Sequence, residues 1–255
     1  MKRVPEITVF FWVIKALTTA MGEATSDFSV KAVDPVVAVG LGGIAFVVAL
    51  GLQLSARRYS APRYWFAVVM VAVFGTMCAD VLHVRFGVPY SVSSTLFAFI
   101  LAAVFISWYA VEHTLSIHSV VTLRRELFYW AAVLSTFAMG TALGDMTAVT
   151  LHIGYLSSGL LFAAVIAVPA FGYAFAGLNE VLAFWSAYVM TRPLGASLAD
   201  WLGLPRVSGG LGWGRGRVSI LFTVPIVLLV GYLTVTRADV VERADGEGAP
   251  DPATG

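Results

Sequence analysis

The sequence predicts an all-α membrane protein with eight transmembrane helices, arranged as four parallel helical-hairpin repeats. Three observations predict this fold class: the composition is apolar, eight long apolar windows follow one another, and one motif recurs. Hydrophobic residues make up 59% of the 255 residues and charged residues 12%, with a mean hydropathy of +0.85. Because soluble domains contain about 25% charged residues, we expect this chain to lie in a lipid bilayer.

Each helix is expected where about 20 residues in a row are mostly apolar, the length that crosses the core of a bilayer. Eight windows meet this condition: residues 7–25, 35–54, 64–83, 90–111, 127–150, 154–176, 180–201 and 217–236. Residues 1–236 are therefore predicted to form a single transmembrane domain, and residues 237–255 a disordered cytoplasmic tail. The N-terminal segment is basic and then apolar, like a secretory signal. However, Lys15 interrupts its apolar stretch, and the segment belongs to the repeat described next. We therefore expect it to be retained in the mature protein.

Asp145 ends an apolar run in which a tryptophan and a glycine stand at fixed distances before it. Trp130, Gly140 and Asp145 are ten and then five residues apart, and this W-x9-G-x4-D frame occurs four times without insertion. The other copies are Trp12, Gly22 and Asp27; Trp65, Gly75 and Asp80; and Trp185, Gly195 and Asp200. A second apolar window follows each copy, which predicts hairpins at approximately 5–58, 59–118, 119–178 and 179–236. Since each hairpin crosses the membrane twice, all four are expected to have the same orientation.

Lysine and arginine are unevenly divided between the two predicted membrane faces. The face shared by both termini has nine of them, and the opposite face has five. The nine are Lys2, Arg3, Arg57, Arg58, Arg63, Arg124, Arg125, Arg237 and Arg243, and the five are Lys31, Arg85, Arg206, Arg215 and Arg217. Because basic residues collect on the cytoplasmic side of membrane proteins, both termini are predicted to be cytoplasmic.

The four frames read "GEATSD", "GTMCAD", "GTALGD" and "GASLAD" from glycine to aspartate. With their tryptophans and hairpins, they resemble a bacterial family of four tandem membrane repeats of unknown function, whose members are described as membrane-anchored proteins. The resemblance covers nearly the whole chain up to about residue 235. It implies a multi-pass protein of the bacterial cytoplasmic (inner) membrane with two spans per repeat, and it implies no activity.

Helix geometry places the repeated residues at common depths. At about 1.5 Å per residue, the glycine lies ~15 Å and the aspartate ~22 Å along the helix from the tryptophan. We expect the tryptophans to anchor at the membrane interface and the glycines to allow close helix packing near the midplane. A carboxylate at the centre of a spanning helix costs about 2.5–3.5 kcal/mol, so intramembrane acids are candidates for function. The four aspartates are therefore predicted to bind ions or to transfer protons.

Polar neighbours extend the candidate site. Glu23, Thr76 and Thr141 stand four residues before their aspartates, on the same helix face. Oxygen ligands of this kind suit Mg²⁺, Mn²⁺, Ca²⁺ or alkali ions. Arg192 precedes Pro193, which predicts a broken helix beside a buried guanidinium. Arg192 is then either part of the site or a structural partner of an acid such as Glu23 or Asp145.

Simpler interpretations of single residues remain open. Asp27 and Asp200 precede turn-like sequence, so each can mark a helix end in interfacial water, while the sequence after Asp80 and Asp145 can continue a helix. His83 and His152 lie on the faces of Asp80 and Asp145 and can complete a metal site, or they can be solvated. Lys15 is expected to extend its ammonium group to the cytoplasmic interface.

Two functions fit these residues. The first is a transporter or channel for a small cation, proton-coupled or specific for a divalent metal; the second is a membrane scaffold whose buried acids form structural ion pairs. We expect no enzyme, because Ser-His and HExxH patterns are missing from the sequence, and no cofactor beyond a bound cation. Cys78 is the single cysteine, which excludes an internal disulfide. The net charge of +1 gives no support for nucleic-acid binding, so the expected partners are lipid and a small cation, with homo-oligomerisation left open.

Overall fold

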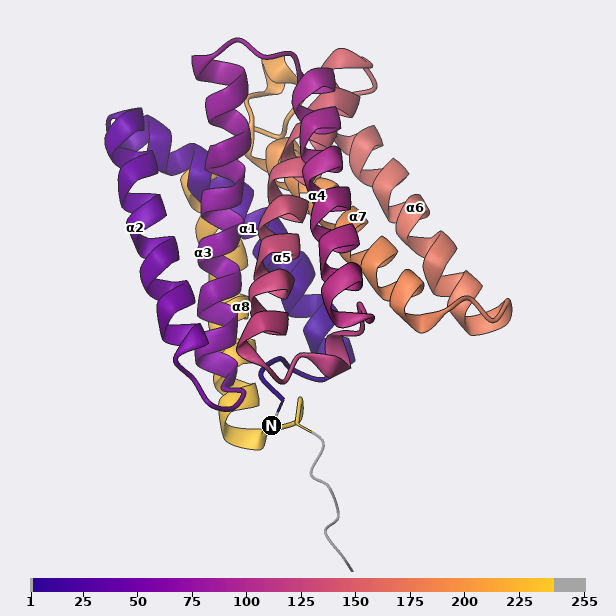
Figure 1. Ribbon diagram of the computed structural model, residues 1–255. Helices are drawn as coiled ribbons and strands as arrows, with labels where there is room; N and C mark the ends of the chain where they lie inside the picture. Colours follow the sequence, from indigo (N-terminus) through magenta and orange to yellow (C-terminus); the bar gives the residue numbers. More distant parts are fainter. Residues whose placement is uncertain (1, 241–255) are drawn as a thin grey trace, which may run out of the picture.

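The computed structural model describes residues 2–240, which form eight long α-helices (Figure 1). They are α1 (Val9–Ala32), α2 (Pro35–Leu54), α3 (Ala61–Asp80), α4 (Tyr90–Glu112), α5 (Leu123–Asp145), α6 (Tyr155–Phe175), α7 (Glu180–Gly203) and α8 (Arg215–Thr236). Four short turns lie between them: two π-helical turns, Val81–Arg85 and Met146–Thr150, and two 3₁₀ turns, Ile117–Ser119 and Arg206–Ser208. Each of the eight predicted windows overlaps one long helix.

Capping side chains fix where several helices begin. The carboxylate of Asp34 accepts hydrogen bonds from the backbone N–H groups of Val36 and Val37, at 3.0 and 3.2 Å, at the start of α2. The side chain of Asn179 does the same at the start of α7. These caps satisfy backbone donors that a helix end otherwise leaves unpaired.

Six of the eight long helices are long and apolar enough to cross a membrane, which is typical of a membrane protein. The two others, α1 and α7, are equally long but do not reach this degree of apolarity. Their charged residues are Lys15, Glu23, Asp27 and Lys31 in α1, and Glu180, Arg192 and Asp200 in α7. All eight helices were predicted to be apolar enough to cross a membrane, and α1 and α7 are not. These two helices supply most of the charged side chains in the interior.

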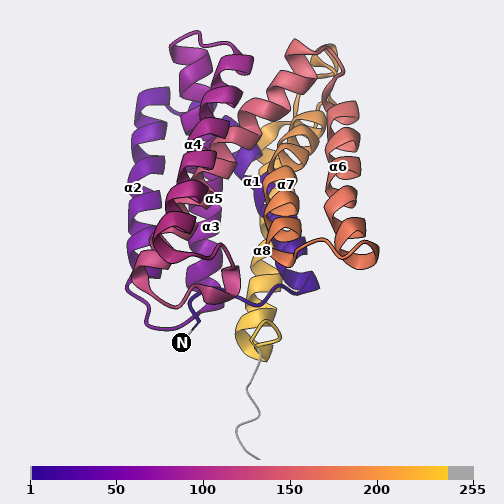
Figure 2. The same cartoon turned by 45° about the vertical axis from the view of Figure 1, so that its right-hand side comes forward.

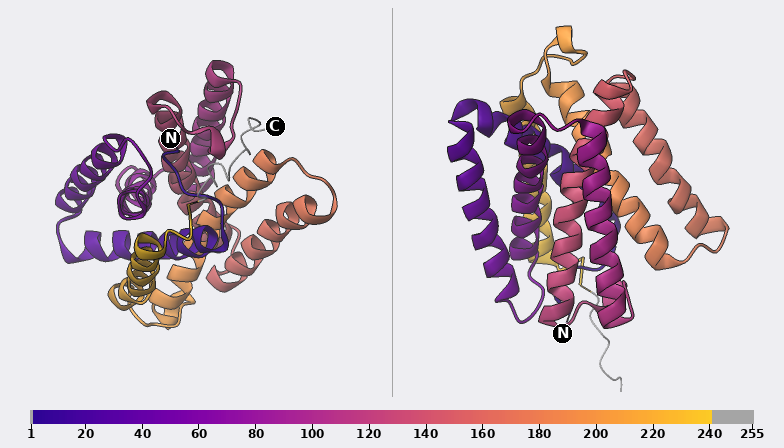
Figure 3. Two further views of the ribbon diagram at one scale, coloured as in Figure 1. Left: turned by 90° about the horizontal axis from the view of Figure 1, so that it is seen from below. Right: turned by 45° about the horizontal axis from the view of Figure 1, so that its top comes forward.

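The odd-numbered helices form the core, and the even-numbered helices surround it. Over their most apolar stretches, 56% of α3 and 67% of α5 is buried, against 11% of α2 and 22% each of α4, α6 and α8. Seen from below, α2, α4, α6 and α8 lie at the periphery (Figure 3, left). Large side chains such as Phe99, Val168 and Leu228 are about 70% exposed there. An apolar outer surface of this extent suits contact with lipid.

Each even-numbered helix packs mainly on the odd-numbered helix of the following hairpin. Thus α2 packs on α3, α4 on α5 and α6 on α7, and α8 returns to pack on α1 (Figure 2). The odd-numbered helices contact one another in the order α1, α3, α5, α7 and back to α1. Each of them begins at the end of the molecule where the N-terminus lies (Figure 1). The four inner helices therefore form a closed ring.

The glycines of the four frames lie where neighbouring inner helices touch. The contacts are Gly22 with Ala72, Gly75 with Phe137, Gly140 with Arg192, and Gly195 with Thr19. A Cβ atom added at Gly75, for example, would lie 2.7 Å from the Cβ of Phe137. In every case the contacted residue stands seven positions after the tryptophan of the next copy, and the fourth copy contacts the first. Small residues let membrane helices approach this closely.

Candidate functional site

Arg192 occupies the interior of the ring, with 0% of its surface exposed. Its guanidinium donates hydrogen bonds to the backbone oxygen of Thr19 at 3.0 Å and to Glu23 Oε2 at 2.7 Å. It also donates to the hydroxyl of Thr141 at 2.6 Å and to that of Thr76. These acceptors come from α1, α3 and α5, so the other three inner helices all contribute. A buried guanidinium needs such acceptors because burying an unpaired charge is strongly unfavourable.

The three side chains that accept from Arg192 occupy equivalent positions in their repeats, directly after the frame glycine. We expected Glu23, Thr76 and Thr141 to act beside their aspartates. All three accept a hydrogen bond from the guanidinium, and Glu23 also lies close to Asp27. Of the two acids considered as structural partners for Arg192, Glu23 forms the pair. The predicted break at Pro193 is wrong, because α7 continues through it from Glu180 to Gly203.

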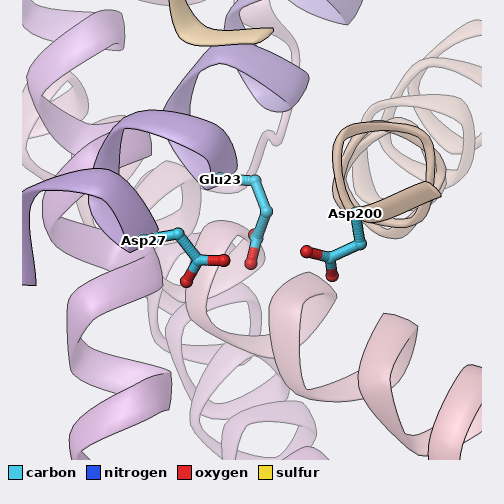
Figure 4. Close-up of side chains that lie close together, drawn as sticks. All are labelled: Glu23, Asp27 and Asp200. Carbon is cyan, nitrogen blue, oxygen red and sulfur yellow. The ribbon is translucent and has the colours of Figure 1, made fainter. Parts of the chain in front are cut away.

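Glu23 also belongs to a cluster of acids nearer the C-terminal ends of α1 and α7. The carboxylate oxygens of Glu23, Asp27 and Asp200 lie within 4.8 Å of one another, and the three side chains point toward one another (Figure 4). Asp200 is only 6% exposed, and in residues 2–240 its carboxylate has neither a hydrogen-bond donor nor an ion-pair partner. Asp200 is therefore not the solvated helix end that the sequence allowed, because α7 packs on α1 at this point.

Asp27 differs from Asp200 in having a cationic partner. It forms an ion pair with Arg215, the first residue of α8. The Asp27 side chain keeps 16% of its surface exposed, so the acid cluster reaches the surface of the protein on this side. The α1 helix continues past Asp27 to Ala32, and Asp27 accordingly does not end its helix either.

Asp80 and Asp145 complete the set of repeated acids from α3 and α5. They occupy the positions in α3 and α5 that Asp27 occupies in α1 and Asp200 in α7. The Oδ2 atom of Asp80 is buried, and no described residue donates a hydrogen bond to it. A π-helical turn follows each of these two aspartates, and such turns are frequent at functional sites. The four aspartates therefore gather toward one end of the ring.

Aromatic side chains fill the ring on the other side of Arg192. The ammonium group of Lys15 lies 4.0 Å from the ring centroids of both Phe137 and Tyr188, and the residue is 1% exposed. The expectation that Lys15 reaches the interface is therefore wrong: two cation–π contacts hold it inside. Tyr64 and Tyr129, each fully buried, are joined through their hydroxyls.

Three of the four frame tryptophans are part of this aromatic filling. Trp65, Trp130 and Trp185 are 2%, 2% and 5% exposed, and Trp185 Nε1 donates to the backbone oxygen of Leu115 at 2.9 Å. They pack inside the protein, Trp185 partly against Phe105 and Trp108 of α4, in contrast to the expected anchoring at the membrane interface. Trp12 alone among the four is partly exposed.

The four frames coincide with a known sequence repeat. The family model described as Repeat of Unknown Function (DUF347) matches residues 10–59, 63–114, 128–178 and 183–239, with one frame in each segment. The chain belongs to this family. The resemblance to a family of tandem repeats of unknown function is thereby confirmed. No match was found among curated proteins or among solved structures.

The histidines of the second and third DUF347 repeats lie outside the acid cluster. His83 pairs through Nδ1 with the backbone oxygen of Val88 at 2.9 Å, and its ring stacks on Tyr90. His152 is exposed and has a left-handed backbone conformation, with φ of 56°. Within residues 2–240, the three side chains close enough to share a metal ion are acids, and neither histidine joins them.

One column of the DUF347 repeats, seven residues after each tryptophan, was not used in the sequence analysis. It contains Thr19, Ala72, Phe137 and Arg192, which are the residues that contact the four glycines. Since the frame glycines were expected to lie at helix contacts, a second column at a fixed distance from them indicates further contact residues. That column would have marked Arg192 and Thr19 as residues of the interior. The sequence offered no comparable signal for Arg215, which lies outside the repeated frame.

Proposed function

We propose that this protein transports a small cation across a membrane, with Glu23, Asp27 and Asp200 as the binding site. The observation that supports this most strongly is the convergence of these three carboxylates within 4.8 Å in a ring of apolar helices. Carboxylate oxygens are preferred ligands of hard cations such as Mg²⁺, Mn²⁺ and Ca²⁺. Asp80 and Asp145, at the corresponding positions of α3 and α5, supply further ligands when the repeats move, or accept protons in exchange for the cation.

The balance of charge favours transport over a purely structural role. A scaffold in which buried acids form ion pairs requires a cation for each acid. Here Arg192 pairs with Glu23 and Arg215 with Asp27. The remaining aspartates of the frame have no ion-pair partner within residues 2–240, and they are Asp80, Asp145 and Asp200. An excess of buried carboxylates attracts a mobile cation or protons.

A carrier fits this arrangement better than an open channel. Arg192 and the aromatic side chains around Lys15 separate the acids from the N-terminal ends of the inner helices. The segment before α1 crosses that end, where Arg3 N–H donates to the Val120 oxygen at 3.2 Å and Tyr59 N–H donates to the Lys2 oxygen at 3.0 Å. A cation bound at the acids therefore crosses only when the repeats move relative to one another.

We further propose that all eight helices cross the bacterial cytoplasmic membrane as four parallel hairpins, with both termini in the cytoplasm. The hydropathy of α1 and α7 does not oppose this, because interior charges are tolerated when they face the protein. Basic residues gathered near the termini support the orientation; they include Arg57, Arg58, Arg63 and Arg237.

The test is flux through the purified protein in proteoliposomes. Uptake of Na⁺, K⁺, Mg²⁺, Mn²⁺ and Ca²⁺ is measured together with internal pH, for wild type and for Asp200→Asn. We expect uptake of one of these ions, reduced about tenfold or more in the variant, because a ligand carboxylate is lost. Glu180→Gln is the matched control: it removes an exposed carboxylate at the other end of α7 and should leave uptake within about twofold.

Two results would contradict the proposal. One is equal uptake by wild type and Asp200→Asn. The other is no uptake of any tested ion by wild-type protein that is correctly folded, which would favour the scaffold.

A further inference from the structure

A cavity of about 1330 Å³ opens at the end of the molecule opposite the acid cluster. Its walls come from the segment before α1, the connection from α2 to α3, the first turn of α3 and the end of α8. Figure 1 shows these segments together at the end where the N-terminus lies. The cavity shares no residue with the cation site, so an inference about it stands apart from the proposed transport.

Five basic side chains and two acids are among the residues that line the cavity. The basic side chains are Lys2, Arg57, Arg58, Arg63 and Arg237. The four arginines are exposed, and among residues 2–240 no carboxylate lies within 4.0 Å of their side-chain nitrogens. Four guanidinium groups from three chain segments therefore face one space without a counter-charge from the described part of the chain.

The acids of the cavity wall are already engaged. Glu6 pairs with Lys2, and its other oxygen lies 3.4 Å from His118 Nδ1. Asp239 is 2% exposed and accepts a hydrogen bond from the Tyr59 hydroxyl. These two acids therefore contact other side chains and do not neutralise the four arginines.

We propose that this cavity binds a phosphate group. Arginine offers a planar set of N–H donors that matches phosphate oxygens in pairs, and such charge-assisted hydrogen bonds are among the strongest in proteins. The volume exceeds the about 300–1,000 Å³ of a typical small-ligand site, which is enough for a glycerophosphate group. The phosphate belongs either to an anionic lipid at the membrane surface, where basic clusters attract headgroups, or to a soluble phosphate ester.

The experiment measures binding to the full-length protein in an uncharged detergent. Two probes are titrated separately by calorimetry: phosphatidylglycerol in mixed micelles, and glycerol 1-phosphate in solution. Wild type is compared with Arg57→Gln/Arg63→Gln. The control is Arg206→Gln/Arg217→Gln, which removes the same charge from exposed arginines elsewhere in the molecule.

We expect at least one probe to bind wild type, with affinity lower by about tenfold or more in the Arg57/Arg63 variant and within about twofold in the control. Binding of phosphatidylglycerol alone would identify a lipid headgroup, and binding of glycerol 1-phosphate would identify a soluble ester. The inference is overturned if neither probe binds folded wild-type protein, or if both double variants weaken binding equally. Melting temperatures of the three proteins show whether each is folded.

Discussion

The guanidinium of Arg192 has acceptors from the other three inner helices and no contact with solvent. Thr141 contacts both members of the Arg192–Glu23 pair, because its hydroxyl also donates to Glu23 Oε2 at 3.4 Å. When one partner of such a buried ion pair is removed, most of the loss of stability comes from leaving the other charge buried and unpaired. The two charges should therefore behave as one unit in mutational tests.

We expect Arg192→Met to lower the free energy of unfolding by about 3–5 kcal/mol, because the buried carboxylate of Glu23 is left without its cation. Unfolding of the detergent-solubilised protein in increasing SDS measures this change. The double variant Arg192→Met/Glu23→Gln removes both charges and should recover most of the loss. If the double variant is as unstable as the single one, the pair does not determine the stability of this site.

At the scale of elements, the ring depends on four points where one inner helix touches the next through a glycine. These contacts bring the helix backbones so close that a methyl group has no room. A glycine on a lipid-facing helix has no such role: around Gly231 of α8, no atom lies within 4 Å of an added Cβ.

Gly75→Ala should lower the free energy of unfolding by about 1–3 kcal/mol, since the new methyl group must displace α5 at Phe137. Gly231→Ala is the matched control, and its helix propensity should leave stability unchanged or raise it by up to about 1 kcal/mol. SDS unfolding of the two variants checks both signs. Equal effects at the two positions would show that helix propensity, and not close packing, decides the result.

The sequence predicted the helices and their repetition well, because apolar length and a fixed frame are local signals. It could not predict which helices pack together: α2, α4, α6 and α8 are apolar nearly all round, so nothing in their pattern selects one neighbour. The same limit explains the errors at single residues. Lys15 and Trp65 have side chains that suit a membrane interface, and only the tertiary contacts of the ring place them inside it.

For the whole molecule, the proposed topology places Ser55 in the cytoplasm and Ser208 outside. Both are exposed, at opposite ends of the helices. In a Cys78→Ala background, a membrane-impermeant maleimide added to intact cells should label Ser208→Cys, and should label Ser55→Cys only after the cells are permeabilised. The reverse pattern would invert the orientation. Labelling of both in intact cells would contradict the odd number of crossings, α3 to α7, between them.

The packing of α8 on α1 repeats the packing of α2 on α3, α4 on α5 and α6 on α7. The segment before α1 and the segment after α8 meet as well, since Glu6 N–H donates to the Asp239 oxygen at 3.1 Å. The four inner helices are therefore nearly equivalent in the ring, and α1 is only the first of them along the chain. A circularly permuted chain that begins at α3, α5 or α7 retains every helix pair, and so does a ring of four separate hairpins. The connectivity of this protein can thus be read as a tetramer of small subunits joined into one gene product.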